Sequence, residues 1–168
     1  HGSPDVGLGG DVAGGAPGEP CWVSGILRDT DGEPIAGARI EVWEADEDGF
    51  YDVQYGDHRV AGRAHLFCGA DGSYRFWGLQ PTPYPIPHDG PVGHMLESTG
   101  RHPWRPAHIH MIVRAPGHRT LTTHIFDEQS DYLDSDAVFA VKPSLVRRFV
   151  PRTAADPDKP EGIEGDWF

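Results

Sequence analysis

His108 and His110 lie two residues apart in the segment 105–110, Arg-Pro-Ala-His-Ile-His. On a β-strand, residues two apart share a face, so both imidazoles would point in one direction, about 6 to 7 Å apart along the backbone. Such a pair is suited to metal ligation, because imidazole is the commonest metal ligand in proteins. The chain has 10 histidines, so a chance occurrence of this spacing is the alternative.

Two neighbouring residues favour the metal interpretation. His124 belongs to the next expected strand, so His108, His110 and His124 together would make a zinc or iron(II) site with a bound water as nucleophile. Arg105 comes three residues before His108 and stays cationic, which indicates that an anionic ligand or substrate also visits the site. The alternative role of Arg105 is a structural ion pair with one of the 26 Asp and Glu residues.

Two tyrosines stand in segments whose backbones are restricted. Tyr51 follows the turn at 48–50, Asp-Gly-Phe, and Tyr84 lies in 82–87, Thr-Pro-Tyr-Pro-Ile-Pro. Three prolines fix the backbone of the second segment and hold its phenol in position. Either tyrosine alone would be interpreted as a packed aromatic residue with a satisfied hydroxyl, and only their combination with the histidines suggests a site.

Turn signals separate short apolar runs along the chain, and four of them are Asp-Gly pairs. We expect seven strands, at residues 21–28, 38–44, 60–67, 73–77, 107–114, 120–126 and 137–141. Helical turns are expected only at 92–98 and 143–149, since 22 Gly and 16 Pro disfavour long helices. The pattern predicts an all-β fold, a β-sandwich with short helical turns and long loops.

The length of 168 residues corresponds to one domain. We expect an irregular lead-in over 1–20, the β-sandwich over 21–150 and an irregular tail over 151–168. Cys21 and Cys68 are too few for a disulfide framework, so we expect buried thiols, with a single bridge as the alternative.

Charge and hydropathy exclude several classes of partner. The net charge of −12 would repel nucleic acid and anionic lipid surfaces. No run of about 18 apolar residues is present to span a membrane. Residues 1–20 have neither the basic start nor the apolar core of a signal peptide, so we expect a cytoplasmic protein.

Four blocks of the sequence together resemble the intradiol ring-cleavage dioxygenases, non-haem iron enzymes that open catechols between the two hydroxyl-bearing carbons. The first is 23–51, VSGILRDTDGEPIAGARIEVWEADEDGFY, and the second is 84–91, YPIPHDGP. The third is 105–110, RPAHIH, and the fourth joins LTTH at 121–124 to YLDSDAV at 132–138. The blocks follow the order of the family and extend over most of the chain, which makes the resemblance more specific than any single motif.

The resemblance implies a prealbumin-like β-sandwich that holds one Fe(III) per chain. Carried over by position, the ligands would be Tyr51, Tyr84, His108 and His110. The chemistry of the ion agrees, because iron(III) is a hard cation that favours anionic oxygen ligands and deprotonates phenols. Zinc would not need tyrosinates, so tyrosine ligation separates this site from the three-histidine alternative.

The resemblance also implies roles for residues around the metal. Tyr84 matches the tyrosinate that leaves the metal when substrate binds, and Arg105 matches the arginine that stabilises charge on the substrate. His124 stands where relatives that cleave catechol often have Gln, which suggests a residue that hydrogen-bonds near the iron and is not a ligand. The residues that match the substrate pocket are Ile86, Pro87 and Val138.

The expected reaction is the cleavage of an aromatic diol or triol by O2 to a muconate- or maleylacetate-type product. The motifs are most similar to those of hydroxyquinol 1,2-dioxygenases, with catechol or chlorocatechol as the alternative substrate. A non-enzymatic β-sandwich binding module is the other class left open. The family pattern implies a helical segment before residue 1 that mediates homodimerisation and closes part of the pocket, and a further strand after Phe168.

Overall fold

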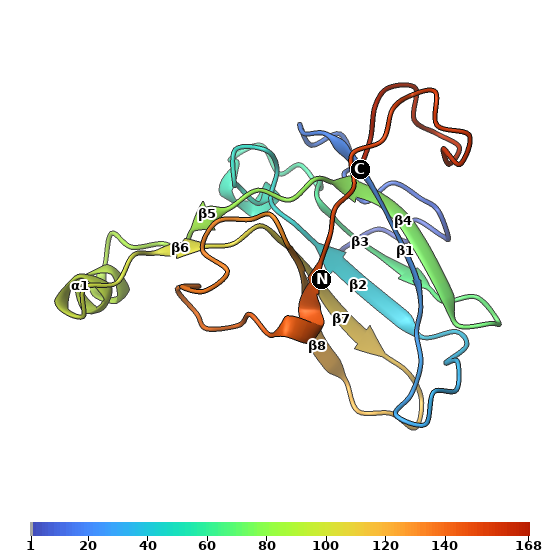
Figure 1. Ribbon diagram of the computed structural model, residues 1–168, viewed down its shortest axis with the longest axis horizontal. Helices are drawn as coiled ribbons and strands as arrows, with labels where there is room; N and C mark the ends of the chain where they lie inside the picture. The colour runs from blue at the N-terminus through green and yellow to red at the C-terminus, as the bar shows by residue number, and fades with distance from the viewer. Residues whose placement is uncertain (1) are drawn as a thin grey trace.

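A five-stranded sheet and a two-stranded sheet pack face to face in the structure, a computed structural model that describes residues 2–168 (Figure 1). The larger sheet has the order β3-β2-β7-β8-β9, the smaller one pairs β1 with β4, and a short third sheet pairs β5 with β6. The strands are β1 (Pro20–Ile26), β2 (Arg39–Trp43), β3 (Arg63–Phe67), β4 (Ser73–Leu79), β5 (Tyr84–Pro85), β6 (Trp104–Arg105), β7 (His108–Arg114), β8 (Leu121–Asp127) and β9 (Val146–Arg147). This arrangement confirms the predicted all-β sandwich.

The core lies between the two main sheets, and residues that alternate along each strand fill it. On β7, Ile109, Met111 and Val113 belong to the buried cluster, so His108 and His110 project from the opposite face of the sheet. Cys21 and Cys68 are both free and buried, as expected, and are also part of this core. The main sheet therefore has a packed inner face and an outer face that carries the histidines.

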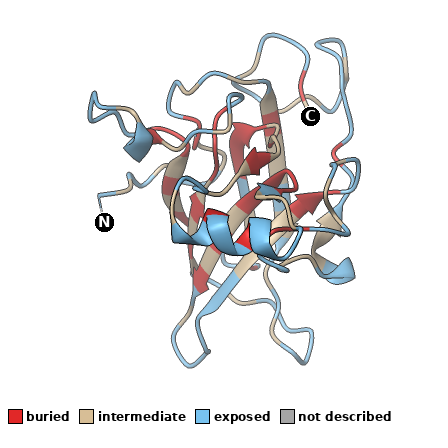
Figure 2. Cartoon of the chain, turned by 90° about the vertical axis from the view of Figure 1, so that its left-hand side faces the viewer, coloured by how far each residue is buried: buried red, intermediate tan, exposed pale blue. Residues whose placement is uncertain are grey.

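Within the described residues, helical structure is limited to three short pieces. The 3-10 helices are η1 (Asp52–Gln54) and η2 (Pro143–Leu145), and the α-helix is α1 (Pro91–Ser98), at the expected position. Most side chains of α1 are exposed, and the helix projects from one end of the molecule (Figures 1 and 2). Within residues 2–168, no helix has the length and apolar character needed to cross a membrane.

The expected strand over 137–141 is wrong. The segment is an irregular loop, in which the side chain of Asp136 accepts hydrogen bonds from the backbone N–H groups of Val138 and Ala140. Phe139 has a left-handed φ of 56°. Side-chain hydrogen bonds therefore take the place of a sheet ladder here, which the apolar run Ala-Val-Phe-Ala-Val does not reveal.

The helical turn expected over 143–149 is correct only for its first three residues. After η2 the chain straightens into β9, which pairs in parallel with β8 through Phe126 and Asp127. The two-residue strands β5 and β6 were not predicted, because a run that short has no period to detect.

The segment around Val12 and the C-terminal Phe168 both pack against the sandwich. Val12 is buried, and its N–H donates to the carbonyl of Trp77 at 2.7 Å. At the other end, Phe168 and Trp22 are joined by a backbone hydrogen bond of 2.7 Å. The expected domain bounds at residues 20 and 150 stay predictions.

Candidate metal centre

The outer face of β7 places His108 and His110 side by side. The Nδ1 of His108 lies 2.6 Å from the carbonyl oxygen of Pro106, which can only accept, so Nδ1 carries the proton. The Nε2 atom of this neutral tautomer is therefore an acceptor, and in the structure it accepts a hydrogen bond of 2.8 Å from Arg105 Nη1. His110 Nε2 lies 3.0 Å from His108 Nε2, so both nitrogens are directed at one point.

Three aromatic side chains form a row across the main sheet at the level of His110. Trp43 of β2 and His124 of β8 are the direct cross-strand partners of His110. The Trp43 ring stacks on the His110 imidazole with ring centroids 4.6 Å apart and an angle of 4° between planes. The large flat ring of Trp43 thereby restricts the orientation of His110.

Tyr84 is held over the histidines by the short third sheet. Its cross-strand partner is Arg105, so the backbone of β6 fixes the tyrosine and the arginine opposite each other. The turn at Gly49 packs against Tyr84 from the other side, where a Cβ on Gly49 would lie 2.8 Å from the Tyr84 Cβ. Gly49 also has a φ of +83°, so both space and backbone conformation require glycine there.

Tyr51 is positioned by the loop that follows β2. The Oδ1 atom of the buried Asp46 accepts hydrogen bonds from the N–H groups of Asp48 and Phe50, which closes the loop just before the tyrosine. The N–H of Tyr51 donates to the side chain of Gln54 at 2.9 Å, and the N–H of Gln54 donates to the Tyr51 carbonyl at 2.9 Å. Local hydrogen bonds thus fix Tyr51 at the start of η1.

The donor atoms of these four side chains converge on one small volume. The two tyrosine hydroxyls are in direct contact. The Tyr84 hydroxyl lies 3.0 Å from His108 Nε2 and 3.4 Å from His110 Nε2, and the Tyr51 hydroxyl lies 3.1 Å from His110 Nε2. Ligands bound at about 2.0 to 2.1 Å to one ion, at right angles to each other, lie about 3 Å apart. Two phenols and two imidazoles at these distances fit a metal ion.

Burial sets the protonation states of these groups. It lowers the pKa of His108 to about 3, with the Arg105 guanidinium as the next cause, and lowers the pKa of His110 to about 2, with His108 as the next cause. Both imidazoles are therefore neutral and have lone pairs to give. Burial also raises the pKa of Tyr51 and of Tyr84 above the ordinary value of 10. A strongly charged cation would be needed to convert these phenols to phenolates at neutral pH.

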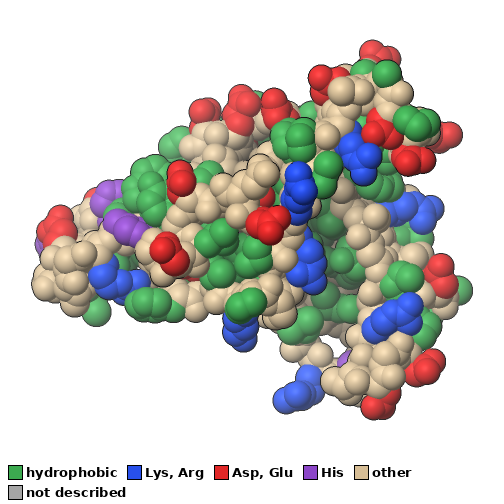
Figure 3. Space-filling view, in the orientation of Figure 1, with side chains coloured by type: hydrophobic (Ala, Val, Ile, Leu, Met, Phe, Trp, Pro, Cys, Tyr) green, Lys and Arg blue, Asp and Glu red, His purple; other side chains and the backbone are tan. Residues whose placement is uncertain are grey.

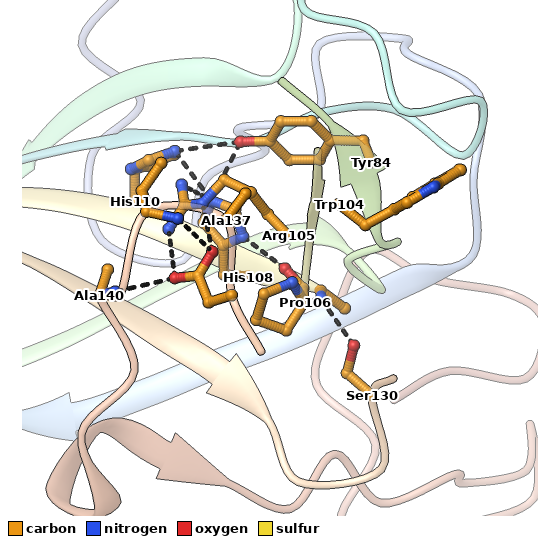
Figure 4. Close-up of polar contacts among 12 residues, drawn as sticks. Tyr84, Trp104, Arg105, Pro106, His108, His110, Ser130, Ala137 and Ala140 are labelled. Atoms are coloured by element: carbon orange, nitrogen blue, oxygen red, sulfur yellow. Dashed lines mark hydrogen bonds and ion pairs between the residues drawn. The ribbon is translucent and has the colours of Figure 1, made fainter. Parts of the chain in front are cut away.

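Arg105 lies at the edge of this cluster and is only 5% exposed (Figure 4). Its Nη1 lies 2.8 Å from His108 Nε2, while Nε and Nη2 lie 3.1 and 3.4 Å from the two carboxylate oxygens of Asp136. Arg105 therefore has both features considered for it, a position beside the proposed ligands and a buried ion pair.

His124 lies close to the histidine pair but has a different orientation. The metal-binding atoms of His108, His110 and His124 are all within 4.8 Å of one another, and the His124 ring stacks on Phe126. Burial lowers the pKa of His124. Within residues 2–168, one group of three or more His, Cys, Asp or Glu side chains could hold a metal ion, and it consists of these three imidazoles. The structure thus contains both the tyrosine-histidine set and the three-histidine set.

The residues expected to contact substrate lie at the surface. Ile86 is half-buried, Pro87 is exposed and Val138 is 45% exposed. A hollow of about 610 Å³ lies elsewhere, between β1 and β8, with apolar walls and arginines at its border (Figure 3). The substrate pocket around these three residues stays a prediction.

The sequence analysis missed four residues that support the site: Trp43, Asp46, Gln54 and Asp136. Two of them have a local sequence signal, the tendency of Asp to accept a hydrogen bond from the backbone N–H two residues further on. Asp46 and Asp136 both form this hydrogen bond. For Trp43 the signal is the register between β2 and β7, which a single sequence does not display.

The chain is similar to proteins whose names are known. A protein family described as Dioxygenase matches residues 6–165. A hydroxyquinol 1,2-dioxygenase of Nocardioides simplex is 62% identical over 169 residues, which cover 99% of this chain and 57% of that protein. One of Rhodococcus opacus is 58% identical over 161 residues, which cover 95% of this chain and 53% of that protein.

Solved structures show the same likeness. The crystal structure of hydroxyquinol 1,2-dioxygenase from Pseudomonas putida DLL-E4 superposes with a TM-score of 0.89 at 40% identity, over 99% of this chain and 59% of that one. The chain spans little more than half the length of these relatives. With both the family match and these identities, the chain belongs to the intradiol ring-cleavage dioxygenases.

Proposed function

We propose that this chain forms the metal-binding core of a hydroxyquinol 1,2-dioxygenase. The enzyme would cleave the aromatic ring between two adjacent hydroxyl-bearing carbons and add both atoms of O2, which gives a maleylacetate- or muconate-type dicarboxylate. The observation that carries this proposal is the convergence of two phenols and two imidazoles, because that donor set suits Fe(III). The names of the relatives support hydroxyquinol over catechol or chlorocatechol.

Tyr51, Tyr84, His108 and His110 would hold one Fe(III) per chain. Bound iron(III) supplies the Lewis acidity that binds the two oxygens of a diol and prepares its ring to react with O2. The Nδ1–H bond to the Pro106 carbonyl keeps the His108 Nε2 lone pair directed at the metal position. As the phenolate that bound iron(III) would stabilise, the Tyr84 oxygen would accept a proton from an incoming diol, since it lies at the centre of the cluster.

Arg105 would stabilise negative charge on the substrate. Its guanidinium is buried and stays protonated, and Nη1 faces the cluster. In a buried site, a fixed donor of this kind stabilises developing charge more than it would in water. The aromatic ring of the substrate would contact Ile86, Pro87 and Val138, and His124 would form a hydrogen bond near the metal. The proposal also includes that the whole protein is a homodimer and that it is located in the cytoplasm.

A visible absorption spectrum, with iron and zinc quantified on the same sample, tests the proposal. We expect about one iron per chain and a red to purple colour from tyrosinate-to-iron absorption. Adding hydroxyquinol without oxygen should shift that band, and admitting oxygen should consume the ring. A protein reconstituted with iron that stays colourless and metal-free would refute the proposal.

The three-histidine site is the second candidate, because the metal-binding atoms of His108, His110 and His124 also approach one another. It predicts a colourless protein that binds zinc or iron(II) and keeps its metal in the Tyr84→Phe variant. The iron(III) site predicts that this variant loses part of its colour and binds iron more weakly. A binding module without a metal would show no stoichiometric iron or zinc.

A further inference from the structure

Asp136 is the buried carboxylate that holds Arg105, and all of its hydrogen bonds lie inside the protein. It is 3% exposed, compared with 5% for Arg105. One carboxylate oxygen accepts from Arg105 Nε at 3.1 Å, and the other lies 3.4 Å from Arg105 Nη2. Two buried ionic groups in this two-point contact leave the guanidinium little freedom to turn.

This contact determines which edge of the guanidinium is available. Arg105 has five N–H donors in a rigid fork, and Asp136 takes the edge made by Nε and Nη2. The remaining Nη1 is the atom that lies 2.8 Å from His108 Nε2. The carboxylate therefore orients the free edge of Arg105 toward the proposed metal ligands and the substrate oxygens beside them.

The same carboxylate also shapes the loop that follows it. Its oxygens accept from the N–H groups of Val138 at 3.3 Å and Ala140 at 2.9 Å. The loop is joined to the strand of Arg105 as well, since the N–H of Ala137 donates to the carbonyl of Trp104 at 3.0 Å (Figure 4). The position of Val138 and the direction of Arg105 thus depend on one side chain.

We propose that Asp136 is a positioning residue that couples Arg105 to the Val138 loop, so that charge stabilisation and ring recognition are set together. This inference rests on the proposed function of the site. Among the described residues, Asp136 forms no hydrogen bond or ion pair with the four proposed ligands, so its action on the reaction passes through Arg105 and Val138. A displacement of about 1 Å in a positioned group lowers a reaction rate by about 100-fold.

Asp136→Asn is the test variant, because it keeps the size of the side chain but places an amide N–H₂ beside a donor of Arg105 or of the loop. Asp134→Asn is the matched control, since Asp134 is an exposed carboxylate in the same loop. We expect Asp136→Asn to keep one iron per chain and its colour, to lose about 100-fold in kcat and to change the kcat/KM ratio between hydroxyquinol and catechol. The control should match the wild type in all of these.

Two further measurements separate positioning from general support of the fold. In an Arg105→Ala background, Asp136→Asn should lower kcat only slightly further, because its effect on charge stabilisation passes through Arg105, while its effect through Val138 is measured by the substrate ratio. In the metal-free chain, the NMR signal of Arg105 Nε–H should be protected from solvent exchange in the wild type and unprotected in Asp136→Asn.

The outcomes also separate this inference from the proposed function. If the iron-loaded wild type cleaves no diol, the proposed function is wrong and the positioning role falls with it. If the wild type is active and Asp136→Asn equals Asp134→Asn in kcat and in substrate ratio, only the positioning role is overturned. Full additivity with Arg105→Ala would also overturn it.

Discussion

The buried carboxyl of Glu44 should make the folded chain lose stability as the pH rises through the neutral range. Glu44 follows Trp43 on the inner side of the sandwich and is 2% exposed. One of its oxygens accepts from the N–H of Leu79 at 2.9 Å, and the other has no partner among the described residues. Burial raises the pKa of Glu44 from 4.5 to about 8, so the side chain is uncharged in the fold at pH 7.

The two pKa values of Glu44, 4.5 and about 8, determine how the free energy of unfolding changes with pH. Between pH 4.5 and about 8, the unfolded chain has released this proton while the folded chain keeps it, so the free energy of unfolding falls as pH rises. At about 1.4 kcal/mol per pH unit, the whole interval corresponds to about 5 kcal/mol. Glu44→Gln removes the titration and keeps an oxygen for the Leu79 N–H, so that variant should lack this loss.

Urea unfolding of the metal-free chain at half-unit steps from pH 5 to pH 9, followed by tryptophan fluorescence, measures the difference. Titrations of other groups are common to both proteins and cancel when the two curves are subtracted. Glu47→Gln is the matched control, because Glu47 is an exposed carboxylate three residues further on. Parallel curves for the wild type and Glu44→Gln over this range would refute the argument that Glu44 is buried as an acid.

Three substitutions test how the metal centre is built. Gly49→Ala should displace Tyr84, because the new Cβ lies 2.8 Å from the tyrosine Cβ, and should weaken iron binding at least about 10-fold in a titration followed by absorbance; unchanged affinity would contradict the close contact. His108→Ala should lose iron or bind it weakly by metal analysis, and full retention of iron and turnover would remove His108 from the site. Trp43→Ala should lower the stability of the metal-free chain by about 3 kcal/mol in urea unfolding, and an unchanged midpoint would show that the stack on His110 does not contribute.

The sequence predicted the parts of the site that depend on local periodicity. Polar and apolar residues alternate in the run His-Ile-His-Met, and its period of two, with the apolar Ile-Val that follows, was enough to predict both the strand β7 and the shared face of His108 and His110. Loop residues such as Tyr51 and Tyr84 have no such period. Their approach to the histidines depends on contacts between segments distant in sequence, and it was expected only from the family resemblance.

The strand expected over 137–141 was wrong because a side chain there competes with the backbone for hydrogen bonds. Residues 137–141 read as a strand by composition, yet Asp136 takes the N–H groups that a strand would offer to a neighbour. The same residue pairs with Arg105, which comes 31 positions earlier. A single sequence does not indicate which of many carboxylates forms an ion pair with a buried arginine, so the partner of Arg105 could be identified only from the structure.

The pairing of Tyr84 with Arg105 makes the relative position of these two residues independent of the length of the segment between them. Residues 86–103, which include α1, leave the body of the protein after β5 and return at β6 (Figure 1). Because the two strands already close this loop, doubling its length would cost only about 0.6 kcal/mol in chain entropy. The exposed surface of α1 is therefore a suitable place to insert a fluorescent label or an affinity tag that leaves the tyrosine and the arginine where they are.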